Sequence, residues 1–221
     1  MTSISENILK LKSALPAGVR LVAVSKTKPA SAVQEAYDAG QRDFGENYVQ
    51  ELVDKKDHLP DDIIWHFIGH LQSNKVKYIA GFVDWIHGVE SEKLLTEINK
   101  QALKNNRIIN CLLQVHIGQE DTKFGFGEEE VKEFCSRVNF SAMTNIRICG
   151  LMGMASFTDD SGQIRTEFKK LKNLFDELKS TYFVNNSAFS EISMGMSSDY
   201  TIAIEEGSTI IRVGSSIFGS R

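Results

Sequence analysis

Short apolar runs alternate with segments of helical periodicity along the whole chain, and this alternation constrains the fold more than any other feature. The runs are continuously apolar, as in residues 21–24 (Leu-Val-Ala-Val), which is typical of strands buried on both faces. The runs that predict strands cover residues 21–24, 42–45, 63–69, 82–87, 108–117, 146–151, 189–193 and 209–213. We therefore expect eight parallel strands, because strict strand–helix alternation is typical of a parallel sheet with helical crossovers.

Helical segments fill the intervals between these runs. Ser3 and Glu6 fit a capping box at the start of the first segment, and Ser91 is a candidate N-cap further along. Pro29 and Gly40 suit the start and the stop of the second segment. The expected helices cover residues 3–15, 29–40, 46–56, 72–80, 91–102, 128–138, 163–179 and 199–206.

Eight strand–helix pairs match the number of units in a (β/α)8 TIM barrel. The chain has 221 residues, so each pair averages about 28 residues, which is near the lower limit for this fold. An open, doubly wound sheet gives the same local pattern, so the periodicity leaves both architectures open. We expect a single barrel domain over residues 1–221 with an extra N-terminal helix, because the eight pairs use the whole chain.

Composition and charge exclude several classes of protein. The formal net charge is −4, which argues against the basic surface of a nucleic-acid-binding protein. No apolar run approaches the ~20 residues that span a membrane, and residues 1–12 lack the apolar core of a signal peptide. Cys111, Cys135 and Cys149 are odd in number and have no CxxC spacing. We expect free, buried thiols and a cytoplasmic location.

A lysine follows the first predicted strand. Lys26 comes after Ser25 at the end of the apolar run, and the carboxyl ends of barrel strands face the active site. Lys28 lies two positions further on, so in an extended chain both amines share one face. Like charge and desolvation both lower the pKa of a lysine and give the free amine that Schiff-base chemistry requires. Two solvated loop lysines are the ordinary alternative.

Small and hydroxyl-bearing residues follow the last two predicted strands. They are residues 193–199 (Ser-Met-Gly-Met-Ser-Ser-Asp) and residues 214–216 (Gly-Ser-Ser). The second turn precedes a predicted short helix, whose first N–H groups and dipole favour a bound phosphate. TIM barrels also often bind a phosphate in the loops after strands seven and eight. Helix capping explains either turn alone. Two such turns on adjacent strands, opposite a lysine on the first strand, favour a phosphate pocket.

Other candidate binding residues give weaker signals in the sequence. His66 and His70 are four apart in a strand-like segment, but no third ligand is evident, so we expect no metal site. Lys123 follows the fifth strand and is a further cationic candidate, with a flexible loop charge as the alternative. A lysine beside a phosphate pocket fits either pyridoxal phosphate or a sugar phosphate attacked by an aldolase lysine. The residues alone leave both ligand classes open.

Five sequence blocks resemble the pyridoxal phosphate homeostasis protein family. They are residues 23–29 (AVSKTKP), 44–51 (FGENYVQE), 65–75 (WHFIGHLQSNK), 193–197 (SMGMS) and 211–214 (IRVG). The blocks occur in the expected order and span essentially the whole chain. The resemblance implies a single (β/α)8 barrel similar to the N-terminal domain of bacterial alanine racemase.

The resemblance also implies a cofactor and the residues that hold it. Pyridoxal 5′-phosphate (PLP) would be bound as a Schiff base on Lys26. The other implied cofactor residues are Ser197, Gly214 and Ser215 at the phosphate, Arg212 facing the pyridine nitrogen, and Asn47 in the pocket. Proteins of this family are regarded as cofactor carriers without an established catalytic activity, so the resemblance implies no catalytic residue.

Arg212 bears on whether such a chain could catalyse a reaction. PLP enzymes that need a strong electron sink commonly protonate the ring nitrogen through an Asp. A permanently charged Arg disfavours that proton and so weakens carbanion stabilisation. A racemase avoids this problem with two well-placed bases, and alanine racemase supplies the opposing base with a second, β-rich domain and a dimer partner. This chain ends at Arg221, two residues after Gly219, so we expect that base to be absent.

We therefore expect a non-catalytic protein that buffers PLP and delivers it to apo PLP-dependent enzymes. It has no nucleic-acid or membrane partner in this interpretation, and it is a monomer. The first alternative is a low-activity PLP-dependent amino-acid racemase in which Lys28, Lys123 or Tyr48 donates a proton. The second alternative is an aldolase that uses Lys26.

Overall fold

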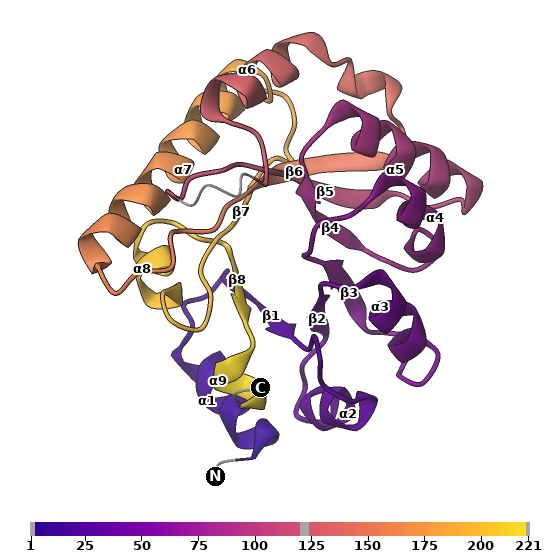
Figure 1. Ribbon diagram of the computed structural model, residues 1–221, viewed down its shortest axis with the longest axis vertical. Helices are drawn as coiled ribbons and strands as arrows, with labels where there is room; N and C mark the ends of the chain where they lie inside the picture. Colours follow the sequence, from indigo (N-terminus) through magenta and orange to yellow (C-terminus); the bar gives the residue numbers. More distant parts are fainter. Residues whose placement is uncertain (1–2, 120–123, 220–221) are drawn as a thin grey trace.

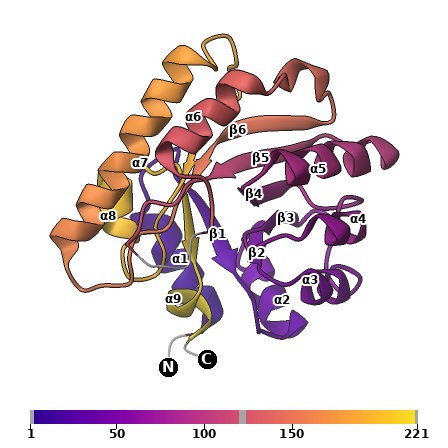
Figure 2. The same ribbon diagram turned by 45° about the horizontal axis from the view of Figure 1, so that its top comes forward.

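The computed structural model describes residues 3–119 and 124–219, and its strands form a closed parallel barrel in sequence order. The barrel closes where β1 (Arg20–Val24) pairs with β8 (Ile210–Val213), with Ala23 opposite Val213. This pairing confirms the (β/α)8 barrel and excludes the open sheet. Figures 1 and 2 show the helices around the outside of the strands.

All eight predicted strands are present, and they differ from the predictions only at their ends. The remaining six are β2 (Asp43–Glu46), β3 (Ile64–Phe67), β4 (Trp85–Val89), β5 (Ile109–Gln114), β6 (Ile146–Met152) and β7 (Glu191–Ser193). The largest shift of a strand start is in β4, which was expected over 82–87 and begins at Trp85. The amides of Phe82 and Val83 instead bond to the carbonyl of Ile79 and complete the preceding helical turn.

The predicted helices are likewise present. They are α1 (Ile4–Ala14), α2 (Ala30–Asp38), α3 (Val49–Lys56), α4 (Val76–Ile79), α5 (Glu92–Lys104), α6 (Glu128–Arg137), α7 (Ser161–Thr181), α8 (Tyr200–Glu205) and α9 (Ser215–Phe218). Short 3-10 turns cover Ser73–Lys75 and Phe140–Ala142. Helix α3 begins three residues later than expected, because Glu46 still pairs with Phe67 in the sheet.

The strands separate two layers of buried side chains. Every second residue faces the helices and joins the large apolar core, as Phe44, Trp65 and Ile86 do. The alternate residues fill the barrel interior. One part of that interior is an apolar cluster of Val22, Trp85, Leu112, Cys149, Met152 and Ile210. The other part is polar and contains the buried side chains of His66, His87, Ser193 and Arg212.

The extra N-terminal helix is confirmed. Its capping box is complete: the Glu6 amide donates to Ser3 Oγ (3.1 Å) and the Ser3 amide donates to Glu6 Oε2 (2.9 Å). Asn7 Nδ2 donates to the carbonyl of Ile217 (3.0 Å), which joins α1 to α9. Both ribbon views place these first and last helices side by side. Helix α1 therefore supports the turn that follows β8.

The three cysteines are free and buried, as expected. Burial raises the pKa of Cys135 to about 12 and that of Cys149 to about 11, so both thiols are protonated at neutral pH. Within the part of the chain that the structure describes, no helix combines the length and apolar character needed to cross a membrane.

Gly150 in β6 provides a test of the barrel geometry. Its φ is +149°, and a Cβ there would lie 1.8 Å from the carbonyl oxygen of Glu191 on β7. We expect Gly150→Ala to lower the free energy of unfolding by more than about 4 kcal/mol, because the contact is with backbone. The control Gly81→Ala meets only the end of the Asn105 side chain at 3.3 Å. Urea denaturation that gave both variants equal stability would contradict this geometry.

Candidate functional site

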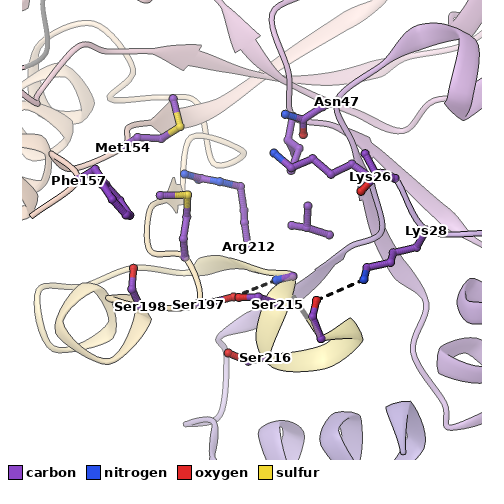
Figure 3. A pocket seen from close by; sticks show the side chains of 16 residues that line it. Lys26, Lys28, Asn47, Met154, Phe157, Ser197, Ser198, Arg212, Ser215 and Ser216 are labelled. Carbon is purple, nitrogen blue, oxygen red and sulfur yellow. Dashed lines mark hydrogen bonds between the residues drawn. The ribbon is translucent and has the colours of Figure 1, made fainter. Parts of the chain in front are cut away.

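A cavity of about 620 Å³ opens at the carboxyl ends of the strands (Figure 3). This volume lies within the range of small-molecule sites. It is lined from β1 and β8, from the segments that follow β1, β2, β3, β6 and β7, and from α9 and its ends. The lining residues are Val24, Lys26, Thr27, Lys28, Asn47, Ile68, Met154, Phe157, Met196, Ser197, Ser198, Arg212, Gly214, Ser215, Ser216 and Gly219. All six residues predicted for the cofactor are among them.

The turn after β1 aims Lys26 into the cavity. Strand β1 ends at Val24, and the Lys28 amide closes a turn by donating to the Ser25 carbonyl (3.1 Å). Thr27 has φ +62°, a left-handed conformation that is uncommon for a residue other than glycine. Lys26 and Lys28 both line the cavity, but through this turn and not through the extended strand that we expected. Figure 3 shows the half-buried Lys26 side chain reaching the same open space as Arg212.

A buried ion cluster supports this turn from below. Lys55 on α3 donates to the Ser25 carbonyl (2.7 Å), Glu46 Oε1 (2.7 Å) and Glu51 Oε1 (2.6 Å). These three bonds use all three protons of the ammonium group. Glu51 Oε1 also accepts from the Thr27 amide (2.5 Å), which fixes the left-handed residue. The cluster therefore determines the position of the backbone on both sides of Lys26.

Within this cluster, the Glu46 carboxylate has the largest free-energy cost of burial, because its side chain is completely shielded from solvent. Its side chain is fully buried, and burial raises its pKa above the ordinary value, against the effect of hydrogen bonds from Lys55 and Ser25. The Ser25 hydroxyl donates to Glu46 Oε1 (2.6 Å), while Oε2 has no partner among the described residues. We did not predict this cluster. Its one sequence signal was the i, i+4 spacing of Glu51 and Lys55, which ordinarily indicates a surface pair.

We expect Lys55→Met to lower the free energy of unfolding by about 3–5 kcal/mol, because it leaves the buried Glu46 carboxylate without its counter-charge. Its neighbour Lys56 is on the same helix but is one-third exposed and pairs only with surface aspartates. Lys56→Met should therefore change stability by less than about 0.5 kcal/mol. Denaturant titrations measure both effects, and a Lys55→Met protein as stable as the parent would contradict the role of the ion pair.

Two turns on the opposite wall present hydroxyl groups to the cavity. Ser197 lies after β7, and its Oγ accepts from the Gly214 amide (3.2 Å), so the two predicted phosphate turns are joined. Ser215 and Ser216 are exposed at the start of α9. Because α9 has only four residues, it contributes hydroxyls and amides more than a helix dipole. Lys28 Nζ donates to the carbonyls of Phe218 (3.1 Å) and Gly219 (3.3 Å) and ties this wall to the β1 turn.

Arg212 reaches the cavity from inside the barrel. Only 4% of it is exposed; Nη1 donates to Ser193 Oγ (2.6 Å) and Nη2 donates to the Gly153 carbonyl (3.0 Å). Burial lowers the pKa of Arg212 to about 10, and the nearby Asp199 acts in the opposite direction. The guanidinium therefore remains charged at neutral pH. Its two anchored nitrogens fix the plane that it presents to a ligand.

Asn47 and an apolar wall complete the cavity. Asn47 Oδ1 is buried and has no hydrogen-bond partner among the described residues, which is costly unless a ligand or water donates to it. Met154 and Phe157 face it across the pocket (Figure 3). We did not predict these apolar residues, because a single Met or Phe after a strand carries no distinctive pattern.

The remaining candidates are placed elsewhere. His66 is fully buried in the barrel interior, whereas β3 ends at Phe67 and leaves His70 in a loop, paired with Glu90 (2.9 Å). The strand-like segment predicted around the two histidines therefore includes His66 but not His70. Tyr48 is half exposed and does not line the cavity, and Lys123 lies outside the described residues. Among the described residues, no group of three His, Cys, Asp or Glu side chains could hold a metal ion.

Comparisons with known proteins agree with this architecture. The sequence profile of the alanine racemase N-terminal domain matches residues 1–221. The pyridoxal phosphate homeostasis protein of Aquifex aeolicus is 42% identical over 203 residues, covering 91% of this chain and 87% of that protein. The Vibrio alginolyticus protein of the same name is 40% identical over 236 residues, covering 100% and 99%. The chain belongs to the pyridoxal phosphate homeostasis protein family.

Solved structures show the same fold. PipY of Synechococcus elongatus, determined with PLP bound, superimposes with a TM-score of 0.89 at 36% identity, covering 98% of this chain and all of that one. Alanine racemase from E. faecalis superimposes with a TM-score of 0.72 at 17% identity. That alignment covers 99% of this chain but 58% of the racemase chain. Family membership therefore extends over the full barrel, and the similarity to the racemase is one of fold.

Proposed function

We propose that this protein binds PLP reversibly, with Lys26 as the amine that condenses with the cofactor aldehyde, and that it buffers and delivers the cofactor. The observation that carries this proposal is one cavity that holds the Lys26 amine, the Arg212 guanidinium and the hydroxyls of Ser197 and Ser215. The relatives named pyridoxal phosphate homeostasis protein and the PLP-bound structure of PipY support the choice of ligand.

The residues present fit PLP by their chemistry. The ligand has an aldehyde, a phosphate, a phenolic hydroxyl and an aromatic ring nitrogen. The cavity offers a lysine amine at one wall and hydroxyl-bearing turns at another, and its volume of about 620 Å³ is ample for the ring. The buried Asn47 Oδ1, which lacks a partner among the described residues, is an acceptor that a ligand donor would satisfy.

Each wall has a distinct role in this proposal. The Lys26 amine would hold the cofactor covalently, because bound PLP would supply an aldehyde with which an amine condenses with loss of one water. Ser197, Gly214 and Ser215, which line the cavity together, would hold the phosphate, and the Arg212 guanidinium would lie at the ring nitrogen. Lys28 holds the end of α9 in place through its two carbonyl contacts. Ser215 and Ser216 are exposed at the mouth of the cavity, which favours exchange of the ligand with solution.

The geometry of Arg212 favours a carrier over an enzyme that needs the pyridine ring as a strong electron sink. PLP chemistry that builds up carbanion character draws on a protonated ring nitrogen, which an acidic side chain usually provides. The Arg212 guanidinium has no lone pair that could accept a hydrogen bond from a protonated ring nitrogen. It is held as a cation by its hydrogen bonds to Ser193 and to the Gly153 carbonyl. We propose a non-catalytic cytoplasmic monomer in which residues 1–221 form one PLP-binding domain that supplies apo PLP-dependent enzymes.

Trapping with borohydride tests the covalent bond. We expect reduction of the PLP-loaded protein to fix a phosphopyridoxyl group on the peptide that contains Lys26. Lys26→Ala should abolish this product while the circular dichroism spectrum stays unchanged, and Lys169→Ala, on the exposed face of α7, should label normally. An unmodified Lys26 peptide at saturating PLP would contradict the proposal. Trapping with dihydroxyacetone phosphate, but not with PLP, would instead favour the aldolase.

The absence of catalysis is tested by α-proton exchange. We expect the PLP-loaded protein to exchange the α-hydrogen of a panel of amino acids with deuterated solvent no faster than free PLP does, because Arg212 keeps the ring nitrogen unprotonated. Mass spectrometry of the recovered amino acids measures the exchange. Incorporation above the free cofactor that is lost in Lys26→Ala would contradict a pure carrier and favour the racemase.

A further inference from the structure

Five side chains form a continuous hydrogen-bonded row through the barrel interior. His66 Nε2 lies 3.0 Å from Asp43 Oδ1, and His66 Nδ1 lies 2.9 Å from His87 Nε2. His87 Nδ1 lies 3.0 Å from Ser193 Oγ, and Ser193 Oγ accepts from Arg212 Nη1 at 2.6 Å. The row begins at the first residue of β2 and ends at Arg212 in the cavity at the other end of the barrel.

One arrangement of protons satisfies every contact in this row. Arg212 can only donate, so its N–H donates to the Ser193 oxygen, and the Ser193 hydroxyl proton is then available to His87 Nδ1. His87 must therefore carry its own proton on Nε2, which donates to His66 Nδ1. His66 in turn carries its proton on Nε2 and donates to the Asp43 carboxylate, which can only accept. Four hydrogen bonds thus point the same way, from the guanidinium to the carboxylate.

The surroundings keep both imidazoles neutral, as this arrangement requires. Both are fully buried, and burial lowers the pKa of His66 and holds that of His87 well below the ordinary value. Asp43 and Asp84 act in the opposite direction on His66, whereas Arg20 on β1 opposes a charge on either ring and Arg212 opposes one on His87. From β6 the inner cluster contributes the Cys149 thiol, whose pKa burial raises to about 11, so that it is uncharged.

Flanking contacts also hold the rings in place. Trp85 stacks on His66 with 5.6 Å between the ring centroids and 5° between the ring planes. The Arg20 guanidinium lies over the Trp85 ring, 4.9 Å from its centroid. His66 and His87 meet edge to face. The rings therefore have little freedom to turn and to exchange their donor and acceptor sides.

We propose that Asp43, His66, His87 and Ser193 form a polarised relay that positions Arg212 for its ligand from the opposite end of the barrel. These four are positioning residues, because they act through Arg212. The hydrogen bond to His87 orients the Ser193 hydroxyl, so that Ser193 Oγ accepts from Arg212 Nη1. The Gly153 carbonyl accepts from Arg212 Nη2, so both terminal nitrogens of the guanidinium are fixed. The inference rests on the proposed PLP site for its effect on binding, but the direction of the relay is a property of the ligand-free protein.

The proton arrangement is tested without any ligand. Long-range ¹⁵N–¹H spectra of the ligand-free protein at pH 7, assigned with His66→Gln and His87→Gln, should show both rings neutral with the proton on Nε2. A proton on Nδ1 of either ring, or a cationic ring, would overturn the relay. A failure of PLP to bind would overturn the proposed function and leave this measurement unaffected, so the two failures are distinguishable.

The effect on binding is tested with two buried serines. Ser193→Ala removes the link to Arg212, and we expect it to weaken PLP binding at least about tenfold and to shift the His87 Nδ1 resonance. Ser208→Ala is the control, since the Ser208 hydroxyl is also buried near β7 and β8 but contacts only backbone carbonyls. It should lower the melting temperature without either effect. Equal losses of affinity in both variants, or none in Ser193→Ala, would overturn the positioning role.

The far end of the relay gives the sharper test. Asp43→Asn replaces the terminal carboxylate by a neutral amide, and we expect it to shift the ¹⁵N resonances of both histidines and to weaken PLP binding about threefold or more. Asp62→Asn, a surface carboxylate paired with Arg42, should do neither. A folded Asp43→Asn protein with parental histidine resonances and parental affinity would overturn the coupling. If Asp43→Asn does not fold, the Ser193 and Ser208 pair decides.

Discussion

The parallel pairing of β1 with β8 is the contact on which the cavity depends. It places Ala23 opposite Val213, so the turn that carries Lys26 and the turn that carries Gly214 leave the barrel at the same level. Lys28 then bonds to the carbonyls at the end of α9, and α1 holds the same short helix through Asn7. Residues separated by almost the full length of the chain thus form one wall, because a closed barrel makes its first and last strands neighbours.

The site is built on groups that are expensive to bury. Glu46 and Lys55 lie under the Lys26 turn, and Arg212 lies in the barrel interior. Burial of a charge is tolerated when its partners are fixed, and here the partners come from several strands at once. The same contacts that offset the cost of burial also restrict the side chains to one arrangement. The same buried contacts therefore determine both the stability of the barrel at the carboxyl ends of its strands and the geometry of the cavity there.

Much of the fold followed from the sequence because apolar periodicity is local. The eight runs and the capping signals at Ser3 and Ser91 predicted elements that the structure contains. Errors occurred at element ends, as at β4, where tertiary hydrogen bonds decide between a helical turn and a strand. The Lys26 turn was likewise expected as extended chain, since nothing local to Thr27 indicates its positive φ, which a distant Glu51 carboxylate stabilises.

By itself the sequence determined the order of strands and helices, and it marked Lys26 and the serine turns as residues at strand ends, whereas Arg212 was implied only by the family resemblance. The tertiary structure alone decided which buried groups meet. His66 and His87 are 21 residues apart, and Ser193 is 106 residues beyond His87, so no spacing links them. They form one row because alternate residues of neighbouring strands all face the interior of a closed barrel. Which side chains of a strand alternate towards one face follows from the local sequence. Which side chains of other strands they meet in the barrel interior is fixed only when the barrel closes.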